Sequence, residues 1–320
     1  MRTIKKVASH IFIDGFGGMT QGLFATLIIG TMIQQIGLLI GGSTGNVIYL
    51  LGKAAAALTS AGIGVGVAVK YGESPLVTVS AAVAAMVGGY AGKITGGTFF
   101  VDGNAVLAGP GEPLGAFIAA FAGITCGHLV SGKTKVDIIV TPVITIGAGS
   151  VVGLLVGPPI SQMMTGLGSI INWATEQRPF IMGIVVSVVM GMVLTLPISS
   201  AALGIILNLS GLAAGAATIG CCCNMVGFAV ASYRENKFGG LVAQGLGTSM
   251  LQVPNIMRHP LIWLPVIFSS AILGPVSTII ANMQNNATGS GMGSAGLVGQ
   301  ITTYQTMIAY DDPKLVIIKI

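Results

Sequence analysis

A single carboxylate stands out in residues 103–117, which read GNAVLAGPGEPLGAF. Glu112 lies between Gly111 and Pro113, and nearly every other side chain in this stretch is small or apolar. A carboxylate here could accept hydrogen bonds from a polar ligand. It could also favour the start of a helix after it, because an acid before a helix N-terminus contributes about 0.3–1 kcal/mol. The two roles are compatible, and Glu112 is therefore our first candidate binding residue.

The other ionisable and nucleophilic residues do not form a catalytic pattern. Only nine acids are present, and all except Asp102 and Glu112 stand at the ends of apolar runs or in polar links. His128, within ITCGHLV, fits a residue at the membrane interface better than a proton relay. Consecutive cysteines at 221–223 point to different faces of a helix, so we expect small buried side chains instead of a metal site. We predict no catalytic residue, no metal site and no cofactor.

The composition indicates that lipid solvates most of the chain. Of 320 residues, 53% are hydrophobic and only 7% are charged, and the mean hydropathy is +0.89. Soluble domains carry about 25% charged residues. The sequence therefore predicts an all-α polytopic membrane protein. The net charge of +5 fits cytoplasmic loops rich in Lys and Arg, and no basic stripe points to nucleic acid as a partner.

Apolar runs of about 20 residues are long enough to cross a bilayer as helices. We predict about eight to ten crossings on this criterion. The runs are residues 20–41, 46–69, 75–92, 114–131, 137–157, 180–204, 207–232, 238–253, 261–283 and 291–309. Two of them, 238–253 and 291–309, are rich in glycine, so their status as spans is open.

Three further segments are too polar for spans and too apolar for solvated loops. They are residues 93–113, 158–178 and 284–300. Irregular backbone at membrane depth is tolerated only where protein or a water-filled cavity covers it. We therefore predict re-entrant hairpins or broken helices in all three. Gly-Pro steps recur in both halves of the chain, which suggests an internal twofold repeat as a hypothesis.

The predicted organisation has three parts. Residues 1–18 combine a basic start with apolar residues at helical spacing, which predicts an amphipathic cytoplasmic arm. Residues 19–309 form a membrane domain, and residues 310–320 form a short polar tail. The basic residues place the N-terminus in the cytoplasm, but the topology of the second half stays open.

These features together resemble the membrane-embedded enzyme IIC components of the bacterial phosphotransferase system. The resemblance rests on the basic arm, the glycine-rich spans, GPGEP at 109–113 and GSGMGSAGLVGQ at 289–300. It extends over most of the chain. More narrowly, the chain is similar to the stand-alone IIC-like family that includes the PfoR-type regulatory membrane proteins.

The resemblance also implies a binding site. In sugar-type IIC proteins, the Glu of a Gly-x-x-Glu-Pro hairpin binds a sugar hydroxyl, and Gly109, Glu112 and Pro113 match this pattern. Glu112 is therefore the implied substrate ligand. The further contacts that we expect are Asn104, Gly109, Gly111, Gly293, Ser294 and Gln300.

The function implied by the resemblance is transport. It is a permease of the bacterial cell (inner) membrane that binds a small hydrophilic solute, a sugar or a polyol, and moves it by an elevator-like displacement within a homodimer. No fused phosphotransfer domain is expected, so IIA and IIB proteins would act in trans. The alternative is a membrane-bound regulator that senses a solute without transporting it. The residues do not reveal the substrate or the source of coupling energy.

Overall fold

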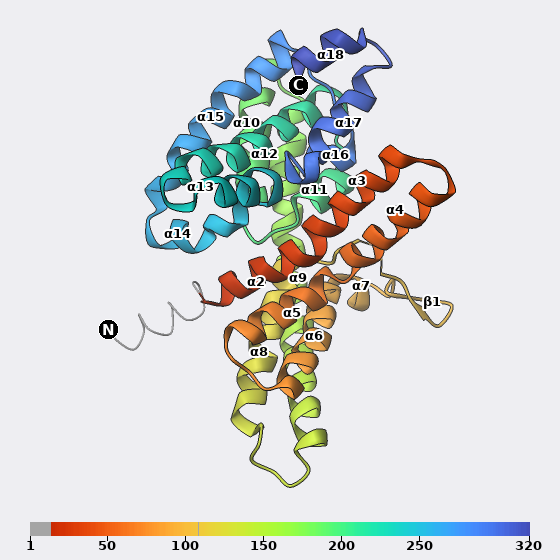
Figure 1. Cartoon of the computed structure of the whole chain (residues 1–320), viewed down its shortest axis with the longest axis vertical. Helices are drawn as coiled ribbons and strands as arrows, with labels where there is room; N and C mark the ends of the chain where they lie inside the picture. Colours follow the sequence, from red (N-terminus) through yellow and green to blue (C-terminus); the bar gives the residue numbers. More distant parts are fainter. Residues whose placement is uncertain (1–13, 108) are drawn as a thin grey trace. The chain divides into compact units, whose positions relative to one another are not determined.

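The computed structural model describes residues 14–107 and 109–320, and the chain divides into two compact units, residues 1–163 and 164–320. Among the described residues, helices dominate and the only sheet is a two-stranded hairpin (Figure 1). The predicted class, an all-α polytopic membrane protein, is confirmed. Most of the predicted amphipathic arm, residues 1–13, lies outside the described residues.

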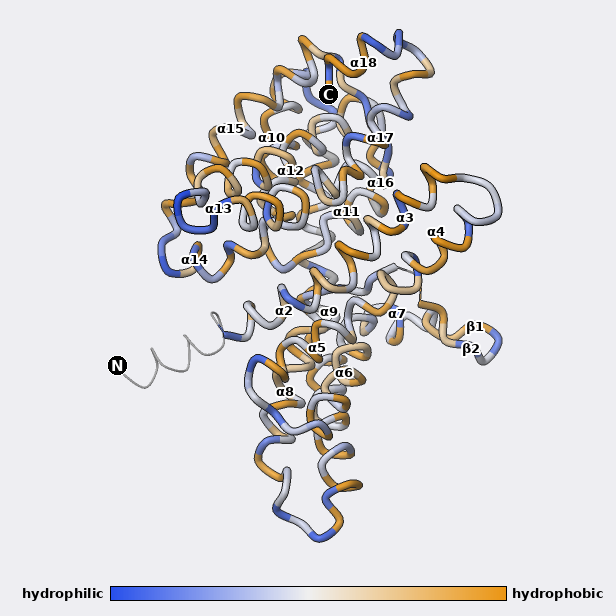
Figure 2. Tube along the Cα trace, in the orientation of Figure 1, coloured by the Kyte–Doolittle hydropathy of each residue, from blue (hydrophilic) through white to orange (hydrophobic). Residues whose placement is uncertain are grey.

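Five helical segments in the described part of the chain are long and apolar enough to cross a membrane. They are Phe16–Ile40, Pro113–Val130, Asp137–Gly157, Gly211–Ala231 and Pro260–Ile280. A sixth span results if Gly42–Ala57 and Thr59–Lys70, which meet at a 53° bend, cross as one. Two shorter apolar helices add to these (Figure 2). Eight of the ten predicted apolar runs fall on these helices, whereas residues 238–253 and 291–309 form shorter helical pieces.

The first unit is a bundle of helices, followed in the chain by the start of a long helix. Its elements are α2 (Phe16–Leu23), η2 (Phe24–Ile28), α3 (Ile29–Ile40), α4 (Gly42–Ala57), α5 (Thr59–Lys70), α6 (Pro75–Gly89), α7 (Ala91–Thr95), β1 (Phe100–Val101), β2 (Asn104–Ala105), α8 (Pro113–Val130) and the start of α9 (Asp137–Thr175). Helix α3 packs against α4, and α2 packs against α5. Helices α5, α6 and α8 contact one another and carry the candidate site (Figure 1).

Small residues let these helices approach closely. A Cβ added to Gly18 of α2 would lie 2.6 Å from the carbonyl oxygen of Gly66 in α5. A Cβ added to Gly153 of α9 would lie 2.9 Å from the Ala119 Cβ of α8 and 2.9 Å from the Gly88 Cα of α6. Lipid is as apolar as the side chains, so close packing of this kind is what holds membrane helices together.

Residues 93–113 contain a β-hairpin, where the sequence predicted a re-entrant hairpin or a broken helix. Strands β1 and β2 pair in register, with Phe100 opposite Ala105. The turn is Asp102–Gly103, with φ values of 50° and 77°. An Asp-Gly pair with positive φ at both positions favours a two-residue hairpin turn. The broken-helix alternative is therefore wrong for residues 100–105, which form a β-hairpin.

The prediction of a break within residues 158–178 is also wrong. Helix α9 continues through the Gly157-Pro158 step and ends at Thr175. Proline fixes φ near −65°, which is the helical value, and membrane helices tolerate the loss of its N–H. A Gly-Pro step alone therefore did not end this helix.

The second unit is built around α10, α12 and α15, which pack together. Its elements after α9 are α10 (Pro179–Thr195), α11 (Ser200–Ile206), α12 (Gly211–Ala231), α13 (Tyr233–Val242), η3 (Ala243–Gly247), η4 (Ser249–Gln252), α14 (Val253–Arg258), η5 (Pro260–Trp263), α15 (Leu264–Pro275), η6 (Val276–Ile280), α16 (Ala287–Ser290), η7 (Ala295–Leu297), α17 (Val298–Met307) and α18 (Pro313–Lys319). Residues 284–300 are broken into short pieces, as predicted.

A buried polar network joins the helices of the second unit. Asn224 is fully buried in α12, and its side-chain nitrogen donates to the Ser270 hydroxyl at 3.1 Å. Trp263 donates to the Asn224 oxygen at 3.1 Å. The Thr195 hydroxyl lies 3.2 Å from the same oxygen and 2.8 Å from the Ser249 hydroxyl. The Thr195 hydroxyl is thus engaged within the protein.

Candidate functional site

Glu112 directly precedes α8, and Pro113 is the first residue of that helix. The sequence predicted this arrangement. The Glu112 side chain is half-buried and makes no capping hydrogen bond to the helix backbone. Its carboxylate nevertheless stands at the positive end of the α8 dipole, where an acidic side chain is stabilising. A charged acceptor is therefore positioned at a helix start without being used as a hydrogen-bonded cap.

The loop that carries Glu112 is anchored to two neighbouring helices. The Glu112 N–H donates to the carbonyl oxygen of Gly89, at the end of α6, at 2.7 Å. The Ser60 hydroxyl of α5 donates to the Pro110 carbonyl oxygen at 3.0 Å. Ser60 is fully buried. These hydrogen bonds hold the loop backbone in place. Neither of them involves the Glu112 side chain.

The Tyr90 side chain connects the same loop to the bend between α4 and α5. Its side chain is 1% exposed, and its hydroxyl contacts the carbonyl oxygen of Gly109. The same hydroxyl lies 3.3 Å from the carbonyl oxygen of Ala57, the last residue of α4. One side chain therefore connects the loop before α8 with the break after α4.

Gly111 is the position at which the loop comes closest to its neighbours. Its φ is 77°, which favours glycine, and an added Cβ would meet the Ser60 hydroxyl and lie 3.1 Å from the Gly89 carbonyl oxygen. Gly109 also has a positive φ, 83°, but faces open space. Glycine is thus required at position 111 for both conformation and space.

Three interruptions of helical structure converge here: the bend between α4 and α5, the end of α6 and the loop before α8. Broken helices at membrane depth present backbone N–H and C=O groups that a regular helix would use internally. The half-buried carboxylate of Glu112 adds a charge to this polar region. The arrangement is suited to binding a polar ligand.

Asn104, predicted as a further contact, lies on the exposed β-hairpin. Its side-chain nitrogen donates to the Asp102 carbonyl oxygen at 3.3 Å, within its own turn. The hairpin is connected to the loop through aromatic contacts, because the ring centroids of Phe99 and Tyr90 are 5.3 Å apart. The structure thus brings Gly109, Gly111 and Glu112 together in one loop and places Asn104 on the hairpin that precedes it.

The predicted contacts of the second unit differ in their free hydrogen-bonding capacity. Gly293 has a φ of 52°, and an added Cβ would lie 2.6 Å from the Cys221 Cβ. The buried Ser294 hydroxyl donates to the Gly245 carbonyl oxygen at 2.6 Å. Gln300 donates to the Cys222 sulfur at 3.6 Å, whereas its side-chain oxygen is buried without a hydrogen-bond partner. Of the three, Gln300 has an acceptor left for a ligand.

The second unit also holds a cavity of about 470 Å³ at the starts of α10 and α12. Its walls are Thr175, Gln177, Pro179, Met182, Leu207, Asn208, Leu209, Ser210, Leu212 and Ala213. None of the residues predicted from the sequence lines it. In the described ranges, 14–107 and 109–320, no three His, Cys, Asp or Glu side chains gather as metal ligands.

Removal of the Tyr90 hydroxyl should loosen the loop. Tyr90→Phe leaves the carbonyl groups of Gly109 and Ala57 without this donor, and we expect a loss of about 1–3 kcal/mol in the free energy of unfolding. Tyr233→Phe, at a side chain that is 47% exposed, is the matched control. Denaturant titration in detergent measures both variants, and equal stabilities would contradict the anchoring role of Tyr90.

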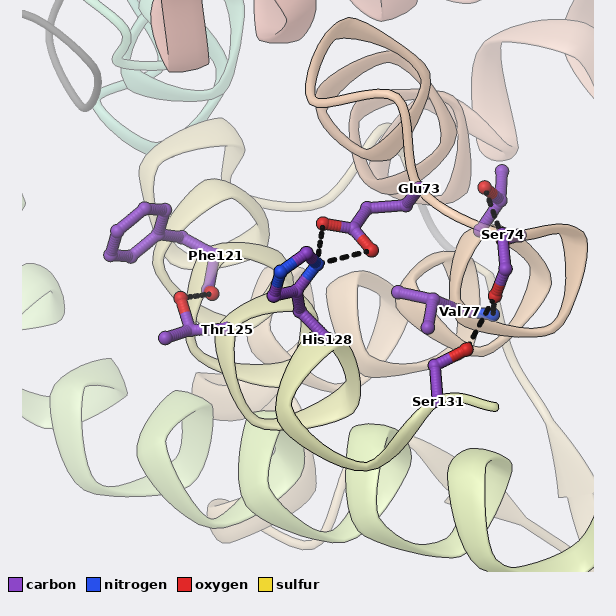
Figure 3. A network of polar contacts seen from close by, with 8 residues as sticks. Glu73, Ser74, Val77, Phe121, Thr125, His128 and Ser131 are labelled. Atoms are coloured by element: carbon purple, nitrogen blue, oxygen red, sulfur yellow. Dashed lines mark hydrogen bonds and ion pairs between the residues drawn. The ribbon is translucent and has the colours of Figure 1, made fainter. Parts of the chain in front are cut away.

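At the end of α8, His128 pairs with Glu73 of the link between α5 and α6 (Figure 3). The His128 Nδ1 atom lies 3.0 Å and 3.2 Å from the two carboxylate oxygens, and the side chains are 71% and 8% exposed respectively. Beside them, the hydroxyls of Ser74 and Ser131 lie 3.0 Å apart. These contacts place His128 at a helix end, as expected for an interfacial residue.

Tyr71 belongs to the same link. Burial raises the pKa of the Tyr71 hydroxyl to about 12, and the nearby Asp14 carboxylate adds to this effect. The hydroxyl therefore remains neutral at physiological pH. The ring of Tyr71 also packs edge-on against Phe121 of α8, with centroids 6.2 Å apart. This link is consequently fastened to α8 by an aromatic contact as well as by polar ones.

The pair of His128 and Glu73 should make a modest contribution to stability. His128→Ala removes the imidazole that lies against the largely buried Glu73 carboxylate, and we expect a cost of up to about 1 kcal/mol in the free energy of unfolding. Thr125→Ala, one turn earlier in α8, serves as the control. A double-mutant cycle with Glu73→Gln measures the coupling, and a coupling energy of zero would contradict the pair.

Apolar helices with broken segments and a buried polar region define the chain as a multi-pass membrane protein of the transporter class. Its sequence matches the family described as "Phosphotransferase system, EIIC" over residues 13–319. The chain therefore belongs to this family and is a membrane permease of the IIC type. The resemblance found in the sequence is confirmed at this level. No curated protein and no solved structure matches the chain.

Proposed function

We propose that the protein binds a small hydrophilic solute, a sugar or a polyol, and carries it across the membrane. Glu112 accepts a hydrogen bond from a solute hydroxyl in this proposal. The observation that carries it is the half-buried carboxylate on an anchored loop where three helix breaks converge. Hydrogen bonds to an ionised acceptor are about twice as strong as those between neutral groups, so one carboxylate can dominate recognition.

The other predicted contacts have defined parts in this proposal. Gly109 leaves open space beside the loop backbone, and Gly111 allows the loop to pack closely against Ser60 and Gly89. Asn104 donates one N–H to the Asp102 carbonyl oxygen, and the rest of its exposed amide is the further contact in this proposal. In the second unit, Gln300 offers a free acceptor, and Gly293 and Ser294 hold the local backbone.

The proposed movement is an elevator-like displacement within a homodimer in the bacterial cell membrane. The anchoring of the Glu112 loop by Ser60, Tyr90 and Gly89 supports it, because α5, α6 and α8 would then move together with the bound solute. Phosphorylation of the solute would require IIA and IIB proteins supplied in trans. We also propose that the chain belongs to the PfoR-type subfamily.

The test is uptake by proteoliposomes, with a panel of radiolabelled hexoses, pentoses and alditols. At least one member should bind and either accumulate or exchange, and the Glu112→Gln protein should lose both properties. Purified IIA and IIB proteins, supplied inside the vesicles in their phosphorylated forms, test whether uptake depends on phosphoryl transfer to the solute. Binding without any movement would instead support the solute-sensing alternative. A panel without a single binding member would contradict the proposal.

A further inference from the structure

The C-terminal helix α18 turns only one apolar residue toward the protein. Val316 is fully buried and packs with Met283 and Met307. The next two residues, Ile317 and Ile318, are 66% and 81% exposed. Helical geometry places Ile318 opposite Val316 and Ile317 on the adjoining flank, since successive residues are rotated by about 100°. The exposed Lys314 also lies opposite Val316. The segment predicted as a short polar tail therefore contains a helix with an apolar outer face.

Local contacts hold this helix in place. The Asp312 carboxylate accepts a hydrogen bond from the Lys314 N–H at 2.8 Å and caps the helix start. At the other end, Lys319 pairs with Asp311 at 2.7 Å. With both ends fixed and Val316 buried, the outer face is a defined surface that exposes Ile317 and Ile318.

The position of α18 in the second unit indicates what covers this outer face. Met283, against which Val316 packs, follows the end of the apolar segment Pro260–Ile280 by three residues. Ile280, at the end of this segment, is 74% exposed, as expected for a side chain that faces lipid. Figures 1 and 2 show α18 beyond the end of α15, within the second unit. Helix α18 therefore packs close to the end of a segment that is long and apolar enough to cross the membrane.

We propose that α18 docks on the lipid surface, with Ile317 and Ile318 at the boundary between headgroups and acyl chains. Short helices with an apolar face bind membranes in this way. Exposed Tyr310, which precedes the helix, is an aromatic residue of the kind enriched at this depth. A second copy of the chain is a weaker candidate, because a seven-residue helix offers far less area than the roughly 1,000 Å² of a stable interface.

Docking of α18 would also support the link before the glycine-rich loop. This link turns at Asn282, where φ is 46°, and the Met283 N–H donates to the Ser277 carbonyl oxygen at 2.8 Å. Val316 packs directly on Met283. Contact with the lipid surface would therefore restrict the movement of the residues that lead into α16 and η7. This inference does not depend on Glu112 or on the identity of the solute.

Tryptophan fluorescence in proteoliposomes tests the docking. Ile318→Trp is made in a Trp173→Phe background, and the signal of the remaining Trp263 is subtracted with the parent protein. Phosphatidylcholine brominated on its acyl chains should quench the new indole, and aqueous iodide should not. Ile279→Trp is the lipid-facing control, and Lys133→Trp is the water-facing control. Quenching by iodide alone, or protection from both quenchers, would overturn the proposal.

A second variant distinguishes the loss of docking from a folding defect. Ile317→Asp combined with Ile318→Asp changes only the outer face and keeps Val316 in its contact. In detergent, its melting temperature should equal that of the wild type. In liposomes, amide hydrogen exchange in residues 313–319 should become faster than in the wild type. Unchanged exchange in liposomes would contradict docking on lipid.

Discussion

Replacement of Glu112 by Gln is expected to lower the affinity for the transported solute by roughly 10- to 100-fold, because a hydrogen bond to a charged group contributes about 1.5–3 kcal/mol. The amide has nearly the shape of the carboxylate. The Glu112 N–H bond to Gly89 involves only the backbone and persists in the variant. The loss should therefore appear in binding, while the melting temperature of the protein stays close to that of the wild type.

Glu73→Gln is the matched control for this result. It also replaces a carboxylate of the first unit by an amide, but Glu73 pairs with His128 in the link between α5 and α6 and not with the loop before α8. Its affinity for the solute should equal that of the wild type. Isothermal titration with the best-binding member of the sugar and polyol panel compares the three proteins. Wild-type affinity in Glu112→Gln would remove Glu112 from the site.

Gly111→Ala is expected to disrupt the loop. Backbone strain at a left-handed position costs about 1–3 kcal/mol. The added Cβ would in addition meet the Ser60 hydroxyl and the Gly89 carbonyl oxygen, which are the groups that anchor the loop. The loop must shift to relieve this contact, and Glu112 shifts with it. We therefore expect both a lower melting temperature and a weaker affinity for the solute.

Gly103→Ala separates strain from packing. Gly103 has the same φ as Gly111, 77°, but a Cβ there would have no atom within 4 Å. It lies in the turn of the exposed hairpin, so its substitution should cost only the roughly 1–2 kcal/mol of the left-handed conformation. Solute affinity should not change. Equal losses of stability and affinity in the two variants would contradict a packed loop at Gly111.

The apolar spans and the helix start at Pro113 could be predicted from the sequence. Hydropathy reports the lipid-facing surface of a span directly, and a Pro after an acid fits the first turn of a helix. The irregular nature of residues 284–300 was also predictable, because its glycines and amides suit neither a span nor a solvated loop. These features are encoded in neighbouring residues.

Features that depend on distant residues were not predictable. The Ser60 hydroxyl contacts Pro110 across 50 residues, and Tyr90 contacts Gly109 across 19. No local sequence pattern predicts either contact. The hairpin at Asp102–Gly103 had a local signal that was outweighed by the expectation of broken helices. At Gly157-Pro158, the flanking apolar sequence continued the helix despite the missing N–H donor.

Protection of Glu112 from carbodiimide labelling tests the central claim most directly. The reagent couples an amine to accessible carboxyl groups, and mass spectrometry reads the extent of labelling at each acid. A saturating concentration of the best-binding panel member should slow the labelling of Glu112 and leave that of Glu176, an exposed acid outside the first unit, unchanged. Labelling of Glu112 at the same rate with and without the bound solute would contradict the account.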